Sequence, residues 1–273
     1  MIDLNSTGMK RAALINDLSC IGKCSLSVAL PIVSAYGVEG VALPTAVLST
    51  HTGGFENYVV RDMTDEMRAF AQHWKSMNVK FDCIYTGYFG SLQQIELAQQ
   101  FITDFGGEDC LVVVDPVLGD NGKLYNGFTP EYIDSMRVLC AMADVITPNH
   151  TEAALLSGLD MDASADVLLD ALDVPNVIVT GVRRGENVGY EARFGEVREQ
   201  FYRPWLHAVM HGTGDVFTSA LCGEYLSGAE KRQGFLAAAD FCDECIQETV
   251  KHQPSHWYGL AFEAVLQKHF NRS

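Results

Sequence analysis

The chain contains one short segment in which glycines, a hydroxyl and a carboxylate precede a helix. Residues 211–215 read His-Gly-Thr-Gly-Asp, and the apolar, helix-forming residues 216–221 follow at once. Glycines leave the backbone open to close approach, and the first N–H groups of a helix favour negative charge because they lack partners within the helix. The pattern predicts an anion site with a base, Asp215, beside it. A carboxylate also stabilises a helix N-terminus, so an ordinary capped helix is the alternative interpretation.

A second polar segment, residues 147–152 (Thr-Pro-Asn-His-Thr-Glu), follows an apolar run. Asn149 and Glu152 are three residues apart and would lie on one face of the first helical turn. An amide and a carboxylate in that position can hold Mg²⁺ through water and position the phosphates of a nucleotide. The alternative is a helix N-cap with an acidic first turn, which is a common way for a helix to begin.

A third segment, residues 114–120 (Val-Asp-Pro-Val-Leu-Gly-Asp), brings two carboxylates to the end of a buried strand. Asp-Pro and Gly-Asp are also favourable turn sequences, so chain reversal explains part of the pattern. Two carboxylates this close, Asp115 and Asp120, still require a cation or hydrogen-bond donors.

Residues 49–55 (Ser-Thr-His-Thr-Gly-Gly-Phe) form a polar, glycine-rich loop after another strand. Hydroxyls, the imidazole of His51 and an aromatic ring could line a pocket for a small polar aromatic ligand. Loops without a binding role often have this composition, and that remains the alternative.

Short apolar runs alternate with helical patterns, which predicts one α/β domain with a mostly parallel sheet and helices on both faces, over residues 11–273. Residues 1–10 are expected to be a flexible N-terminal extension. Ligands bind at the carboxyl edge of such sheets, so Asp17, Asp115, Thr147, Asn149 and Thr180 are predicted to face one crevice. The expected strands are 12–16, 41–44, 83–86, 111–115, 145–147 and 177–180, then an antiparallel pair, 187–193 and 197–203; the expected helices are 25–36, 63–77, 91–105, 130–140, 150–157, 164–172, 213–226, 232–250 and 257–269.

The composition excludes several classes of protein. A formal net charge of −16 without a Lys/Arg cluster argues against a nucleic-acid partner. We find no apolar run long enough to cross a membrane and no signal sequence, so a protein without a membrane partner is expected. Eight scattered cysteines favour a reducing, cytoplasmic location, and Cys242 and Cys245 are interpreted as thiols of one helix rather than half a zinc site. Neither a Walker loop nor a dinucleotide-binding GxGxxG is present.

The order of these segments resembles the ribokinase superfamily, and within it the pyridoxal (vitamin B6) kinases. The resemblance extends from about Arg11 to the last helices. It is carried by Asp17 after the first strand, by residues 49–53, 86–88, 115–120 and 147–152, and by the late Gly-Thr-Gly-Asp that opens a helix.

The resemblance implies a ribokinase-like three-layer α/β/α fold and ATP-dependent phosphorylation of the hydroxymethyl group of a B6 vitamer. Asp215 would be the general base, with the amides of Gly212, Thr213 and Gly214 as the anion hole. It implies ATP contacts at Asp115, Thr147, Asn149, Glu152 and Thr180, Mg²⁺ held near Glu152 and Asp115, and substrate contacts at Asp17, His51, Thr52, Tyr88, Asp120 and Tyr125. A homodimer is expected, and a requirement for a monovalent cation such as K⁺ stays open.

Two alternatives remain at this stage. Relatives often carry Ser near position 17, where this chain has Asp17, so recognition of the ring is open and a hydroxymethylpyrimidine kinase is the main alternative enzyme. A relative that binds a B6 vitamer or a nucleotide without catalysis is the second.

Overall fold

The computed structural model describes residues 5, 8–207 and 210–270. The expected N-terminal extension lies partly outside these residues. Within it, the side chain of Asn5 donates to the backbone of Asn78 and accepts from the backbone of Lys80. None of the described helices is long and apolar enough to span a membrane.

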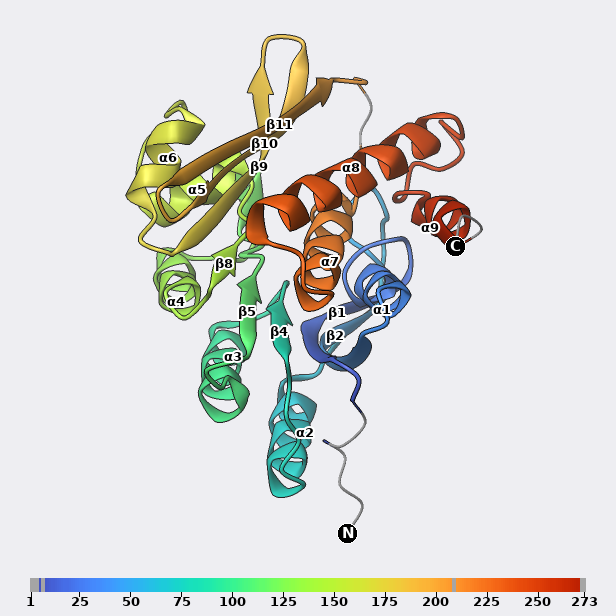
Figure 1. Ribbon diagram of the computed structural model, residues 1–273. Helices are drawn as coiled ribbons and strands as arrows, with labels where there is room; N and C mark the ends of the chain where they lie inside the picture. Colours follow the sequence, from blue (N-terminus) through green and yellow to red (C-terminus); the bar gives the residue numbers. More distant parts are fainter. Residues whose placement is uncertain (1–4, 6–7, 208–209, 271–273) are drawn as a thin grey trace.

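Nine strands of the described chain form one sheet in the order β11-β10-β9-β8-β5-β4-β1-β2-β3 (Figure 1). The five pairings from β2 through β1, β4, β5 and β8 to β9 are parallel, and β10, β11 and the edge strand β3 run antiparallel. The main strands are β1 (Arg11–Ile21), β2 (Glu39–Thr50), β3 (Val60–Asp62), β4 (Cys83–Thr86), β5 (Leu111–Val114), β8 (Val145–Ile146), β9 (Asn176–Arg184), β10 (Asn187–Phe194) and β11 (Val197–Pro204), and a separate short hairpin joins β6 (Gly119–Asp120) to β7 (Lys123–Leu124).

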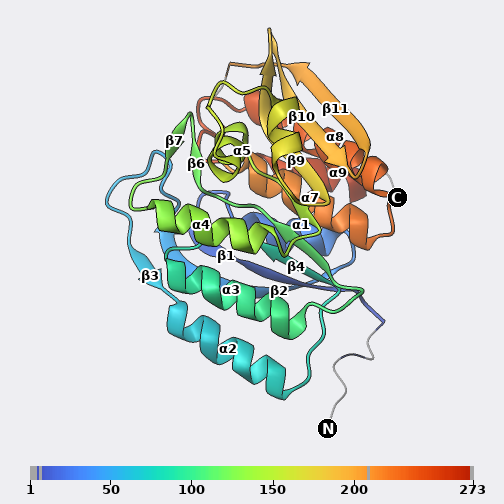
Figure 2. The same cartoon turned by 90° about the vertical axis from the view of Figure 1, so that its left-hand side faces the viewer.

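Helices cover both faces of this sheet, as Figures 1 and 2 show, so the predicted three-layer α/β/α fold is confirmed. One face packs against α2 (Thr64–Ser76), α3 (Leu92–Phe105), α4 (Pro130–Cys140), α5 (His150–Ser157) and α6 (Ala165–Ala171), and the other against α1 (Leu26–Ala35), α7 (Thr213–Leu226), α8 (Lys231–Val250) and α9 (Phe262–Phe270).

Strand β1 shows why the sequence forms a sheet that is buried on both faces. Its residues alternate between the two cores, with Ala13 and Ile15 in one and Ala12 and Leu14 in the other. A central parallel strand covered on both sides is mostly apolar, and β1 fits this rule from Ala12 to Ile15, before its buried polar residues Asn16 and Asp17. These two residues lie where the register between β1 and β2 shifts.

Three expectations about the elements need correction. Strand β1 continues to Ile21, so Asp17 lies within the strand and not after it. Helix α9 begins at Phe262 instead of 257, since residues 251–258 form successive turns. Strand β3 was not predicted, because its three residues are exposed and include two charges.

Candidate active site

The anion loop predicted at residues 211–214 opens helix α7. Gly212 is the N-cap residue in a left-handed conformation (φ 77°), and no side chain caps the helix. Asp215 lies in the first turn without making a capping bond, so no side chain caps the helix, although a carboxylate in this position still stabilises the N-terminus of α7. A Cβ on Gly212 would lie 2.1 Å from the carbonyl oxygen of Lys23, so only glycine fits against the loop after β1.

The carboxylate of Asp215 is held by residues from the other end of the chain. Its Oδ1 lies 3.4 Å from the Asn16 side-chain nitrogen, and the backbone N–H of Ser25 also donates to it. Burial, helped by the nearby charge of Asp17 and opposed by the two hydrogen bonds, raises the pKa of Asp215 to about 7. A carboxyl group with this pKa can accept a proton near neutral pH.

Asn16 connects the base to the neighbouring strand ends, and the sequence reasoning missed it. Its side-chain oxygen accepts hydrogen bonds from the backbone N–H groups of Asp17 (2.9 Å) and Tyr88 (2.8 Å). A Cβ on Gly87 would lie 2.3 Å from the Asn16 amide, so the glycine makes room for it. Asn16 therefore holds the Asp215 carboxylate in a fixed position relative to the backbone at Tyr88.

Ser25 is the second residue that the sequence reasoning missed. Its backbone has φ 58° and ψ −132°, which is unusual for a residue with a side chain. In this conformation its N–H points to Asp215 while its hydroxyl donates to Asp17. Strain at a position that orders two carboxylates is typical of a functional site.

Asp17 is a buried carboxylate beside this base. The hydroxyls of Ser25 and Ser19 donate to it, yet burial still raises the pKa of Asp17 above its usual range. Burial raises the pKa of the Tyr88 phenol, and the nearby charge of Asp17 adds to this shift.

Two histidine rings join the loop after β2 to the anion loop. The backbone N–H of Gly53 donates to Nδ1 of His51, so Nε2 carries the hydrogen and donates to the carbonyl of Tyr258, 2.8 Å away. The rings of His51 and His211 are 5.1 Å apart, and Phe55 lies 4.9 Å from His51. Thr52 next to them is exposed. Burial, and then His51, lower the pKa of His211.

Asn149 and Glu152 form a complete capping box at the start of α5. The two carboxylate oxygens of Glu152 accept from the backbone of Leu118 and of Asn149, and the Asn149 side chain donates to the carbonyl of Gly119. The capping interpretation is thus confirmed. The hydrogen bonds to Leu118 and Gly119 also hold the loop that carries Asp120 against α5.

Asp115 and Glu152 form a buried acidic pair near the anion loop. Burial, followed by the charges of Glu152 and Asp215, holds the pKa of Asp115 well above its usual range, and burial raises that of Glu152 to about 7. A Cβ on Gly214 would lie 3.4 Å from Asp115 Oδ2. Among the described residues no cluster of three or more His, Cys, Asp or Glu could hold a metal alone.

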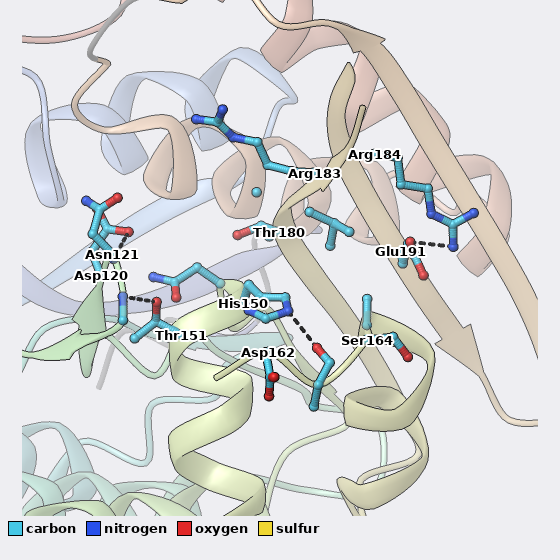
Figure 3. Close-up of a pocket in the computed structure, with 16 residues that line it drawn as sticks. Asp120, Asn121, His150, Thr151, Asp162, Ser164, Thr180, Arg183, Arg184 and Glu191 are labelled. Carbon is cyan, nitrogen blue, oxygen red and sulfur yellow. Dashed lines mark hydrogen bonds and ion pairs between the residues drawn. The ribbon is translucent and has the colours of Figure 1, made fainter. Parts of the chain in front are cut away.

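A cavity of about 600 Å³ opens between the start of α5 and the end of β9 (Figure 3). Its size falls in the range of small-molecule sites, roughly 300–1,000 Å³. Of the predicted site residues, Asn149, Thr180 and Asp120 line it. The other three predicted ATP-site residues, Asp115, Thr147 and Glu152, do not line it and are buried. The hydroxyl of Thr147 lies 3.0 Å from that of Thr218. The cavity is lined by residues 120–122, 149–151, 162–165, 180–184 and 191.

Tyr125 lies on the loop after the β6/β7 hairpin and is 43% exposed. The charges of Glu152 and Asp120 add to burial in raising the pKa of its phenol. The predicted residues thus fall into two groups: Asp17 within β1 together with His51, Thr52 and Tyr88 just after β2 and β4, and Asp120, Asn149 and Thr180 around the cavity. Asp115, Glu152 and Asp215 lie between them.

The eight cysteines are all free, and Cys242 and Cys245 are fully buried on α8. Their interpretation as core thiols is confirmed.

Comparisons with known proteins agree with this arrangement. The family model described as phosphomethylpyrimidine kinase matches residues 29–259. Pyridoxine kinase of Bacillus subtilis is 29% identical over 260 residues, which cover 88% of this chain and 92% of that protein.

Two solved structures have the same fold. A Bacteroides thetaiotaomicron protein assigned to the phosphomethylpyrimidine kinases is 37% identical, with a TM-score of 0.92 over 97% of this chain and 95% of that one; a second crystal form of it is described with pyridoxal. Pyridoxal kinase of Lactobacillus plantarum is 31% identical, with a TM-score of 0.88 over 95% of this chain and 96% of that one. The chain therefore belongs to the phosphomethylpyrimidine kinase family, within the ribokinase-like superfamily of kinases.

Proposed function

We propose that this protein is an ATP-dependent pyridoxal-type kinase that phosphorylates the hydroxymethyl group of pyridoxal, pyridoxamine and pyridoxine. The observation that carries the proposal is the position of Asp215, a carboxylate with a pKa of about 7 beside the uncapped N-terminus of α7. Pyridoxal in a crystal form of the Bacteroides relative supports this choice of substrate.

In the proposed reaction, Asp215 takes the proton of the substrate hydroxyl as its oxygen attacks the γ-phosphorus of ATP, and ADP leaves. The backbone N–H groups of Gly212, Thr213 and Gly214 receive the negative charge that develops on the phosphoryl oxygens. A single such donor is often worth about 3–4 kcal/mol in the transition state.

ATP is assigned to the cavity between α5 and β9, with Asn149 and Thr180 in its wall and Thr147 behind it. The buried repulsion between Asp115 and Glu152 fits a divalent cation in this position. Both carboxylates are proposed to hold Mg²⁺ together with the nucleotide, and the ion would neutralise phosphate charge. This local positive charge would offset the net charge of −16.

The ring of the substrate is assigned to the group formed by Asp17, His51, Thr52 and Tyr88. Asp17 and Tyr88 offer a carboxylate and a phenol for polar atoms of the ring, and His51 and Thr52 lie at its edge. Asp120 and Tyr125 border both ligands. Because Asp17 accepts from two hydroxyls and its charge raises the pKa of Asp215, a change at this position would affect ring binding and Asp215 together.

The alternative substrate, hydroxymethylpyrimidine, offers the same reactive CH₂OH, and the name of the matching family favours it. We expect kcat/KM for pyridoxal to exceed that for the pyrimidine alcohol by at least about tenfold, because ring contacts missing from a misfit substrate leave buried polar groups unpaired. Steady-state kinetics with pyridoxal, pyridoxamine, pyridoxine and the pyrimidine alcohol test this. The reverse order would assign the chain to the pyrimidine kinases.

The pKa of Asp215 predicts how activity depends on pH. A base is active when ionised, so kcat/KM for pyridoxine should fall as the pH decreases through about 7. Glu152→Gln is the control variant, because the pKa of Glu152 is also about 7. Removing this carboxyl group should leave the fall of kcat/KM that is due to Asp215. A profile that stays flat between about pH 5.5 and 8 would contradict the assignment of Asp215 as the base.

A homodimer is proposed on the exposed edge of the sheet. Strand β3 ends the sheet, and Tyr58, Val59 and Val60 expose between 40% and 52% of their surface at this edge. An edge strand with unpaired backbone N–H and C=O groups is a template for pairing with a second chain. Light scattering should give twice the monomer mass of 30.0 kDa, and Val60→Asp should shift it toward the monomer. A wild-type mass near 30.0 kDa would overturn the proposal.

A further inference from the structure

Arg183 is a cationic side chain in the wall of the nucleotide cavity that the proposed reaction has not used. It lies near the end of β9, three residues after Thr180. Figure 3 shows its side chain crossing the upper side of the cavity, with the guanidinium on the side of Asp120 and Asn121 and away from Glu191.

The guanidinium of Arg183 is stacked on an indole ring. Its Cζ lies 3.3 Å from the ring centroid of Trp205, and the His207 ring lies 3.8 Å from the same indole. Trp205 is itself fixed by its backbone N–H, which donates to the carbonyl of Glu186 (2.8 Å). Stacking uses the face of the guanidinium and leaves its N–H groups, which lie in the plane, free to bind an anion.

The neighbouring arginine, Arg184, differs from Arg183 because it pairs with a carboxylate. Arg184 also lines the cavity, but its guanidinium lies 2.7 Å from the buried carboxylate of Glu191. No described carboxylate lies within 4.0 Å of the Arg183 guanidinium, which packs against the Trp205 indole. In a chain with a net charge of −16, a cation positioned by a ring rather than by an acid remains available to an anionic ligand.

We infer that Arg183 binds the phosphate groups of the nucleotide and that Trp205 is a positioning residue that holds its guanidinium over the cavity. This inference rests on the proposed function, which puts ATP in this cavity. Arginine matches phosphate with two parallel N–H bonds, and a side chain already held in place loses less conformational entropy on binding.

The test measures the Kd of ATP, ADP and adenosine for wild type and Arg183→Gln, with adenosine followed by competition. We expect the Kd of ATP and ADP to rise at least about tenfold in the variant, as for the loss of a charged hydrogen bond, and that of adenosine to stay unchanged. Trp205→Ala should weaken ATP binding less than Arg183→Gln, while Trp205→Phe, which keeps a ring, should restore most of the affinity.

Arg203→Gln is the matched control. Arg203 also stacks on a ring, with its Cζ 4.3 Å from the Phe201 centroid, but it pairs with Asp240 outside the cavity. The same loss of charge there should leave the Kd of ATP unchanged, and a similar change in both variants would mean a general charge effect and overturn the inference.

Two other results would also overturn it: an unchanged Kd of ATP in Arg183→Gln, or an equal loss for ATP and adenosine, which would indicate contact with the base or ribose. These results are distinct from failure of the kinase proposal. In that case wild type would bind ATP but phosphorylate no alcohol, and the series of Kd values would still decide the role of Arg183. Absence of nucleotide binding by wild type would overturn both.

Discussion

Asp215→Asn is expected to lower kcat for pyridoxal by about three orders of magnitude, within the range of 10²–10⁴ for loss of general-base catalysis. The amide keeps the size of the side chain and an oxygen that can accept from Ser25 and Asn16, but it takes no proton at neutral pH. The Kd of ATP should change little, because the base faces the substrate hydroxyl. Wild-type kcat in the variant would refute the role of Asp215.

The same variant should be more stable than wild type at pH 8. The pKa of Asp215 is raised in the folded state, so its contribution to the free energy of unfolding is present at low pH and is lost as the pH rises from about 4 through about 7. Asn has no charge to bury. We expect the Tm of the variant to exceed that of wild type by a few degrees at pH 8 and by little at pH 5. A variant Tm below that of wild type at pH 8 would mean that hydrogen bonds to the Asp215 carboxylate outweigh the cost of burying its charge.

Gly212→Ala should reduce kcat by about 10²–10³, the range for loss of one oxyanion donor. The new methyl group would lie 2.1 Å from the Lys23 carbonyl oxygen, and alanine at φ 77° adds about 1–2 kcal/mol of strain. The loop must move, and the amides that face the phosphoryl group move with it. Steady-state kinetics on protein that is shown to be folded by circular dichroism provide the measurement.

Gly195→Ala is the control for backbone strain. Gly195 has φ 57° at the β10–β11 turn and no atom within 4 Å of an added Cβ, so the strain is similar but no collision arises. We expect kcat to be unchanged. If both variants lose activity equally, the effect is global instability and the anion-hole assignment loses its support.

The elements that could be predicted are those with a local signal in the sequence. Strand β5 is apolar throughout because helices cover both faces, and the start of α5 has the side chains of a capping box. Strand β3 has no such signal, since its residues are exposed. The turns before α9 include Pro254, and their position depends on contacts of Tyr258 with Lys23 and His51.

The residues of the site that could be predicted are those that carry chemistry at a strand end or helix start. Asp215, Asp115 and Glu152 have this character. Asn16 and Ser25 do not, because their roles depend on partners up to 199 residues away and on one unusual backbone conformation. The stacking of Arg183 on Trp205 likewise joins two segments that neither periodicity nor spacing relates.

The most direct test of the proposed kinase activity is transfer of label from [γ-³²P]ATP to pyridoxal in the presence of Mg²⁺. We expect labelled pyridoxal 5′-phosphate with wild type and only background with Asp215→Asn. Label that stays in ATP with every B6 vitamer and with the pyrimidine alcohol, although the nucleotide binds, would contradict it and identify a binding protein without catalysis.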